Sequence, residues 1–565
     1  MGCDSDGGEG SSSGGSSSGD GGGTASTKPA WMGLTGARQA DLPHETPGVT
    51  TSFVTGEQCR QCHQANEANK NAVRDAKGRD VSPGTTWRKS MMGLAARDPF
   101  YLAAWAEERV TMPGIKGAID GVCSRCHATA GNVETGGKLS FEDLVSGTSN
   151  EARVARDGVT CTVCHQIQAA GLGTPASFTG GFTIGASREL YGPHLGPATG
   201  PMTLIVNYTP VYSNHVVKSS FCATCHTVIT PARDDAGALV GAQFPEQTPY
   251  LEWQNSAFQD EVPPTGPRAM SCVGCHAPAY DDDNQGIKTA LSVNPTGLAA
   301  RDPFGRHHFA GGSSSMLRLM AKNAAWVGTD VAPSELEDQA KRSDAHLSKA
   351  AELAVVEQKR EGGTLIVRVK VTNSTGHKLP TGYPSRRMWL HLAVKDGATT
   401  TWESGAWDAY GRIVDGAKLV DVPGTFQPHR DVVSAPGEVQ IWEGVAGKQD
   451  GSMAGRLLEA AKYVKDDRLL PEGYKADHKV AIYMRPQGVA GDPDFGSSDT
   501  VTYKITPAPP PGAAIAVELV YQSIKPSDLD ALAKKPTPIA LKFFDLVESS
   551  PIVPVVMVRA ESRAP

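Results

Sequence analysis

Ten of the eleven cysteines of this 565-residue chain occur in one repeated pattern, Cys-x-x-Cys-His. This pattern is the attachment signature of a c-type haem. Five copies within about 220 residues predict five covalently bound haems and a fold built around them. The motif residues are Cys59, Cys62 and His63; Cys123, Cys126 and His127; Cys161, Cys164 and His165; Cys222, Cys225 and His226; and Cys272, Cys275 and His276.

The spacing fits the chemistry of haem attachment. Two residues between the cysteines, wound into a helical turn, bring both thiols to one edge of a porphyrin, and the following imidazole serves as an iron ligand. A lone Cys-x-x-Cys also occurs in redox dithiols, disulfides and zinc sites. With 15 His in the chain, a His after all five pairs arises by chance about once in a hundred million sequences, so we interpret every pair as a haem site.

Haem attachment of this type is completed outside the cytoplasm, which predicts an exported protein, periplasmic or at the outer membrane or cell surface. Cys3 is the cysteine left over, and it precedes a Gly/Ser-rich run. We expect a lipid on Cys3, which would attach the protein to a membrane, and a disordered tether over residues 1–45. The alternative is an incidental free cysteine in a tail.

The charge balance bears on partners. The formal net charge is −7, and no basic run stands out, which argues against nucleic acid. We expect redox proteins, other cytochromes among them, as partners. Asp281, Asp282 and Asp283 lie in an acidic run that departs from the calcium-loop pattern, so we expect a solvated loop and no calcium.

The pattern of apolar residues predicts two folded parts. Residues 46–340 hold all five motifs among short helices, such as 99–110, and irregular loops. Residues 350–565 contain no cysteine and favour an antiparallel β-sandwich that ends with a short helix over 526–533. The expected strands are 353–357, 364–371, 388–395, 399–403, 438–443, 479–485, 499–505 and 514–521.

Each iron also needs a sixth ligand or an open site, and this choice decides function. Ten histidines lie outside the motifs. His346, His391, His429 and His478 look like ordinary surface or strand histidines. The candidate distal ligands are His44, His194, His215, His307, His308, His377 and the thioether of Met92.

A short sequence pattern occurs twice, each time upstream of a haem motif. Residues 87–92 and 253–258 both have the pattern Trp-x-x-Ser-x-apolar. These segments, the five motifs and the stretch 221–227 resemble bacterial multihaem cytochromes, distantly similar to the hydroxylamine oxidoreductase and pentahaem nitrite reductase superfamily, over residues 50–320. In that group a Trp-x-x-Ser-x-His segment supplies a distal His, whereas this chain has Met92 and Phe258 at that position. The stretch 376–387 resembles a C-terminal β-domain that accompanies such cytochromes.

Two functions follow as expectations. The first is an electron-transfer conduit or carrier, in which neighbouring haems pass electrons along the chain. The second is an oxidoreductase acting on a small nitrogen or sulfur compound at one open-site haem, with Arg301, Arg306 and His307 as a possible anion-binding group. No Cys-x-x-Cys-Lys motif occurs, unlike in pentahaem nitrite reductases. Whether the chain is an enzyme stays open at this level.

Overall fold

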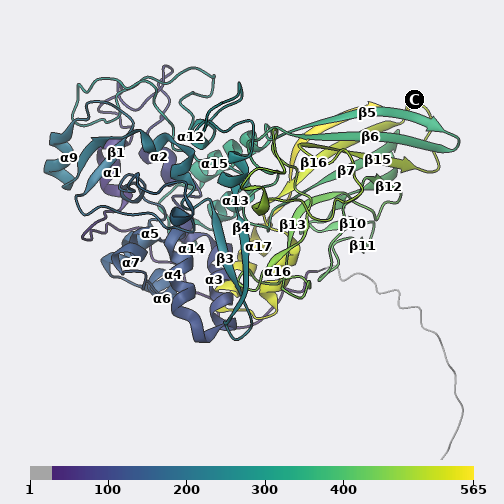
Figure 1. Cartoon of the computed structure of the whole chain (residues 1–565), viewed down its shortest axis with the longest axis horizontal. Coiled ribbons are helices and arrows are strands. Elements are labelled where there is room, and N and C mark those ends of the chain that lie inside the picture. The colour runs from purple at the N-terminus through teal and green to yellow at the C-terminus, as the bar shows by residue number, and fades with distance from the viewer. Residues whose placement is uncertain (1–27) are drawn as a thin grey trace, which may run out of the picture.

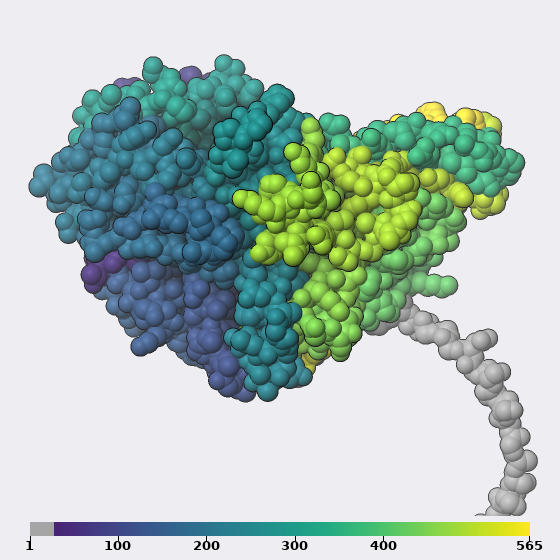
Figure 2. All heavy atoms as spheres, viewed as in Figure 1, coloured from purple at the N-terminus to yellow at the C-terminus, as the bar shows by residue number. Residues whose placement is uncertain are grey.

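The computed structural model describes residues 28–565. It has a helical N-terminal half and an antiparallel-sheet-rich C-terminal half, which lie side by side in Figure 1 and meet along a broad surface in Figure 2. The predicted lipid site at Cys3 lies outside the described residues. No helix among residues 28–565 is long and apolar enough to cross a membrane.

The N-terminal half consists of short helices joined by long loops, with two small two-stranded sheets. The helices are α1 (Gly56–His63), α2 (Pro83–Arg88), α3 (Pro99–Thr111), α4 (Lys116–His127), α5 (Thr129–Glu134), α6 (Phe141–Ser146), α7 (Asn150–Arg156), α8 (Cys161–Cys164), α9 (Thr199–Val206), α10 (Ser219–Cys222), α11 (Pro249–Gln254), α12 (Cys272–His276), α13 (Ser314–Lys322), α14 (Ala324–Val327) and α15 (Pro333–Leu347). The strands are β1 (Glu189–Gly192), β2 (Thr209–Tyr212), β3 (Val228–Arg233) and β4 (Leu239–Gln247).

The predicted helix over 99–110 is confirmed as α3, and its boundaries have a local cause. Pro99 stands at its first turn, where its fixed φ and missing N–H cost nothing. The Asp98 carboxylate caps the helix by accepting from the Phe100 and Tyr101 amides at 2.9 and 3.3 Å. Leu102 and Trp105 on its inner face are fully buried.

The C-terminal half contains two large sheets with a common core and a small sheet with the strand order β11-β10-β9. One has the strand order β12-β15-β6-β5 and the other β14-β13-β7-β16-β17, with β8 beside β7. Val369 and Tyr503 of the first sheet pack with Leu392 and Val517 of the second. The strands are β5 (Ala351–Glu361), β6 (Thr364–Asn373), β7 (Arg387–Asp396), β8 (Thr399–Ser404), β9 (Ala406–Trp407), β10 (Ile413–Asp415), β11 (Lys418–Leu419), β12 (Val432–Val433), β13 (Ile441–Gly447), β14 (Lys462–Asp466), β15 (Ser498–Ile505), β16 (Ala514–Gln522) and β17 (Val555–Arg563), followed in Figure 1 by colour from teal to yellow.

The predicted strand over 479–485 is wrong. The segment forms a short 3-10 turn, Ala481–Tyr483. Val480 packs into a cluster with Tyr250 and Trp253 of the helical half, so the apolar residues of this segment serve an interface rather than one face of a sheet. The sequence prediction also omitted β14, β17 and α17 (Pro538–Ser549), while α16 (Pro526–Ala533) matches it.

The expected tether is too long. From residue 28 the chain is packed: Trp31 is buried and stacks on Phe544 of α17 with ring centroids 5.7 Å apart. Arg38 pairs with Asp545 at 3.0 Å. The same core cluster includes α3, α13 and α17, so elements from both ends of the chain share one apolar interior.

Candidate cofactor site

The five motifs form helical turns, and each turn sets its thiols and imidazole on one side. α1 and α4 end on His63 and His127, and α8, α10 and α12 contain or end on motif cysteines. In α12 the Ser271 hydroxyl caps the turn by accepting from the Gly274 amide at 3.1 Å.

The motifs lie next to one another in the helical half. Three thiol pairs lie close together across motifs: Cys59 raises the pKa of the Cys161 thiol, Cys225 lowers that of Cys126, and Cys272 raises that of Cys222. Cys164 also lies close enough to Cys222 and Cys225 to raise the pKa of both thiols. The first motif therefore adjoins the third, the third adjoins the fourth, and the fourth adjoins the second and the fifth.

The motif imidazoles are held in the form that binds a metal. Nδ1 of His63, His165 and His276 lies 2.8, 2.6 and 2.8 Å from a backbone carbonyl oxygen, and that of His127 lies 3.2 Å from one. Burial lowers the pKa of His127 and His226 to about 4, so both rings are neutral at neutral pH. An Nδ1–H donated to a carbonyl leaves Nε2 free to coordinate iron.

Two further histidines face motif histidines. The ring centroid of His307 lies 6.4 Å from that of His165, with 29° between the ring planes. His377 lies 6.5 Å from His276 with 17° between the planes. Two imidazoles that bind one metal ion from opposite sides, with bonds of about 2.0 Å, have ring centroids about 6 Å apart. Nδ1 of His307 and His377 lies 3.2 and 2.8 Å from a backbone carbonyl oxygen, which leaves both Nε2 atoms free.

His377 reaches this position from the C-terminal half through an anchored loop. The fully buried Glu252 of α11 accepts from the Lys378 amide at 3.0 Å and from the Thr381 hydroxyl at 2.5 Å, both at Oε2. The Lys378 ammonium in turn bonds Asp466 at 2.6 Å with no exposure to solvent. A carboxylate of the helical half therefore fixes the loop that carries a candidate ligand from the other half.

The other candidate ligands lie in different surroundings. Nδ1 of His215 lies 2.6 Å from the Ser213 hydroxyl and Nε2 lies 2.8 Å from the Ile167 carbonyl, so neither nitrogen is free for iron and this geometry does not favour the prediction. The side chain of His44 is 61% exposed beside Asp330. His194 lies half-buried near Arg301.

His308 and Met92 remain predictions, and His346, expected to be an ordinary surface or strand histidine, lies beside a motif histidine. His308 is buried with Nδ1 3.0 Å from Gln339, and the Met92 side chain is half-buried. The ring centroid of His346 lies 5.0 Å from that of His276. The sequence offered no signal for this contact, because it depends on α15 packing against α13.

The two Trp-x-x-Ser segments have the same structural role. Trp87 Nε1 donates to the Val159 carbonyl at 2.9 Å, two residues before the third motif, and the Val159 amide donates to the Met92 carbonyl at 3.0 Å. Trp253 Nε1 donates to the Met270 carbonyl at 2.9 Å, two residues before the fifth motif, and the Met270 amide donates to the Phe258 carbonyl at 2.8 Å. Both copies brace the backbone that leads into a motif.

Two polar side chains, those of Tyr101 and Glu246, lie near the second and fourth motifs. Tyr101 stacks on His127 with ring centroids 3.7 Å apart and donates to the Cys123 carbonyl at 2.6 Å. Burial raises the pKa of Glu246 to about 8, with smaller contributions from Cys126 and Glu108. Among the residues from 28 onward, no second imidazole faces His127 or His226 as His307 faces His165.

The donor set fits haem better than a small metal ion. All motif thiols are free and only partly buried, although they lie inside the helical half. Within the described part of the chain, no three motif cysteine or histidine side chains gather tightly enough to hold one ion. A structural zinc site needs four such ligands around a point, whereas a thioether-bound haem needs two thiols and one imidazole per site.

The side chains of the acidic run and the arginines of the expected anion-binding group are engaged in ion pairs and hydrogen bonds. Asp282 accepts from Arg306 and Arg342, both at 2.6 Å. Asp283 pairs with Lys77 and Arg79 at 2.9 and 2.6 Å. Arg301 donates to the carbonyls of Leu195 and Gly196. These side chains hold loops together, which weakens the case for an anion site built from Arg301 and Arg306.

Comparison with known proteins finds one similar solved structure and no matching family model or curated protein. No family model matches the chain, and no curated protein matches it. Among solved structures, the chain is similar to a penta-heme cytochrome c552 from Thermochromatium tepidum, with a TM-score of 0.49 and 15% identity over 91% of this chain and 100% of that one. A likeness at this level leaves the function to be argued from the residues of this chain.

Proposed function

We propose that this chain is an exported c-type cytochrome with five covalent haems and that it carries electrons among them. The observation that carries the proposal is the series of contacts between motif thiols, which links the first, third and fourth motifs and connects the second and fifth to the fourth. Haems attached at these neighbouring motifs would each have another haem nearby with which to exchange electrons. The haems supply one-electron redox chemistry when bound.

The protein's own part is to hold ligands and set potentials. His63, His127, His165, His226 and His276 serve as proximal ligands in this proposal. His307 and His377 serve as distal ligands of the third and fifth haems, supported by the ring separations of 6.4 and 6.5 Å. Two imidazole ligands give a lower potential than a His and a Met.

The C-terminal half supplies a ligand to one of the proposed haem sites. It carries His377 into the helical half, where Glu252 and Asp466 fix the loop. We infer that this half completes one haem site and also offers surface to redox partners, other cytochromes among them. Lipid attachment at Cys3, which would hold the protein on a membrane, belongs to the same proposal.

A second candidate function is reduction or oxidation of a small nitrogen or sulfur compound at an open iron. Two features favour it: the lack of a facing imidazole at His127 and His226 within residues 28–565, and the half-buried Tyr101 and buried Glu246 near the second motif. Tyr and Glu side chains can deliver protons to a bound substrate.

Low-temperature EPR of the oxidised, fully haem-loaded protein separates the two. Low-spin signals that account for all five irons support electron transfer alone. A high-spin signal from one iron that changes on adding nitrite or hydroxylamine supports the enzyme. The variant His391→Ala is a control, because His391 lies on β7 between Glu403 and Glu518, and its spectrum should equal that of the wild type.

A further inference from the structure

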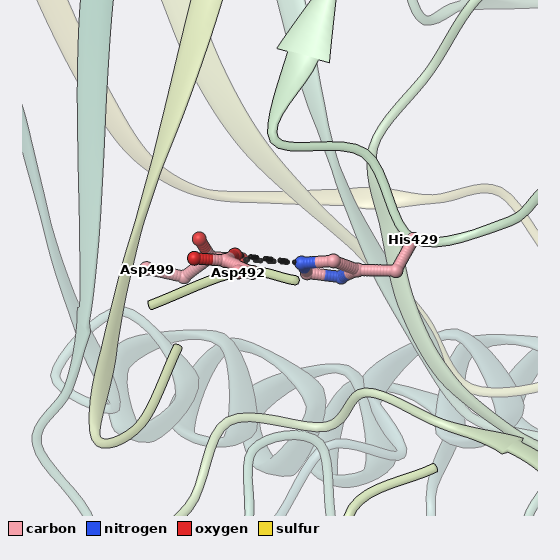
Figure 3. Close-up of side chains that lie close together, drawn as sticks. All are labelled: His429, Asp492 and Asp499. Atoms are coloured by element: carbon pink, nitrogen blue, oxygen red, sulfur yellow. Dashed lines mark hydrogen bonds and ion pairs between the residues drawn. The ribbon is translucent and has the colours of Figure 1, made fainter. Parts of the chain in front are cut away.

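The C-terminal half contains a second group of metal-binding side chains that no haem would use. His429, Asp492 and Asp499 have ligand atoms within 4.8 Å of one another. Figure 3 shows the carboxylates of Asp492 and Asp499 on the same side of the His429 ring. His429 precedes β12, Asp492 lies in the loop before β15, and Asp499 lies on β15.

The imidazole is oriented as in a metal site. Nδ1 of His429 lies 3.0 Å from an oxygen of the fully buried Asp467, and Nε2 lies 2.8 Å from Asp492 and 3.8 Å from Asp499. A metal-binding His commonly donates one ring N–H to a carboxylate and turns the other nitrogen to the ion. Gln440 donates to Asp467 at 3.1 Å and holds that carboxylate in place.

Asp499 supplies a second, independent observation that points to a bound cation. Its side chain has no exposure to solvent, and Trp442 Nε1 donates to Oδ2 at 2.8 Å. Its Oδ1 is buried without any hydrogen-bond partner. A buried carboxylate oxygen left unpaired is costly, and a cation between Asp499, Asp492 and Nε2 would satisfy it.

The local charge also calls for a cation. Asp492 and Asp499 have no Arg or Lys partner among residues 28–565, since their ion pairs are with His429. Lys465 lies 3.4 Å from Asp467 and the same distance from Glu443, so it serves other carboxylates. Asp492 and Asp499 therefore share one imidazole as their ion-pair partner, whereas Asp467 also pairs with Lys465.

We propose that His429, Asp492 and Asp499 bind one divalent transition-metal ion of the zinc type. The imidazole favours such an ion over calcium, which takes six to eight oxygen ligands. Three protein ligands leave a position for water. Asp492 also lines a cavity of about 390 Å³ with Tyr474 and Phe495, which gives an ion and its water a way in.

The ion would tie together loops that meet the helical half. The loop after β14 reaches the segment that follows α11, where the Ala257 amide donates to the Glu472 carbonyl at 2.7 Å and Asn255 donates to the Lys475 carbonyl at 2.9 Å. A metal bridge between β12, β15 and the loop before β15 would fix the cavity wall beside that interface.

The test uses the full, matured chain. Protein dialysed against EDTA is titrated with zinc by calorimetry, and the retained zinc per chain is measured by elemental analysis after gel filtration. We expect one zinc per chain and at least tenfold weaker binding in Asp499→Asn, which keeps the side-chain volume and the acceptor for Trp442. His391→Gln is the matched control, since His391 also lies between two carboxylates, at 2.9 and 3.0 Å.

Each outcome decides the proposal. Zinc binding lost in Asp499→Asn and kept in His391→Gln supports it, and excess calcium should not displace the zinc. No retained zinc, or equal binding in both variants, overturns it. If Asp499→Asn fails to fold, the wild type decides: a thermal midpoint that rises with one equivalent of zinc supports the site, and an unchanged midpoint refutes it.

Discussion

Glu252 should control whether His377 stays in place opposite His276. Its Oε2 accepts two hydrogen bonds from the His377 loop, and Oε1 lies 3.4 Å from the Thr248 hydroxyl. Hydrogen bonds to a buried charged group contribute about 1.5–3 kcal/mol each. Glu252→Ala should therefore destabilise the docked loop by about 3–6 kcal/mol, and the neutral acceptor in Glu252→Gln should lose about half of that.

A loss of about 3 kcal/mol lowers the preference for the docked loop about a hundredfold. If His377 is a ligand, one iron then changes from low-spin to high-spin in the EPR spectrum of Glu252→Ala, and added imidazole restores the low-spin signal. A merely structural role for Glu252 would lower the thermal midpoint without changing any spin state.

The matched control is Glu518→Ala. Glu518 also holds a histidine, His391, at 3.0 Å, and pairs with Arg559 at 2.7 Å on the surface. Exposed pairs of this kind contribute up to about 1 kcal/mol. The reasoning is refuted if Glu252→Ala leaves both stability and spin states as in this control.

Three further predictions concern the other ligand, the shared core and pH. His307→Met should raise the potential of one haem, because a thioether replaces an imidazole opposite His165; spectropotentiometric titration should show one shifted step, and an unchanged titration would exclude His307 as a ligand. Phe543→Ala should lower the free energy of unfolding by about 3–5 kcal/mol, since Phe543 of α17 is fully buried in the core that includes α3. Both halves of the variant should unfold in one calorimetric transition, and two separate transitions would contradict a shared core. Burial raises the pKa of Asp528 to about 6, so the folded chain binds this proton more tightly than the unfolded chain, and stability falls as pH rises from about 4 to about 6. Asp528→Asn should remove up to ~3 kcal/mol of this pH-dependent decrease in the free energy of unfolding. Urea unfolding at pH 4 and pH 7 measures the decrease, and a variant that shows the same decrease as the wild type would count against the prediction.

The elements that depend on local chemistry were predictable from sequence. The motifs, α3 with its Asp98 cap and Pro99, and the β5–β6 hairpin at Gly362 and Gly363 all follow from neighbouring residues. α17 carried a usable signal that was overlooked, namely Thr537 as N-cap before Pro538 and apolar residues at helical spacing.

The contacts between distant segments were not predictable. His377 lies about one hundred residues after His276, and only the anchoring of its loop by Glu252 brings the two rings together. The strand expected over 479–485 failed for a related reason, because Val480 packs on the helical half. The packing of Trp31 on α17 joins residues more than five hundred positions apart.

The most direct test of the account is the mass of the matured chain under denaturing conditions, after treatment with a thiol-alkylating reagent. The account predicts a chain heavier by five haems, with none of the ten motif cysteines alkylated, and a matching haem-to-protein ratio in the pyridine haemochrome assay. A chain without haem whose motif cysteines are alkylated, or whose neighbouring pairs such as Cys59 and Cys161 are joined as disulfides, would contradict it.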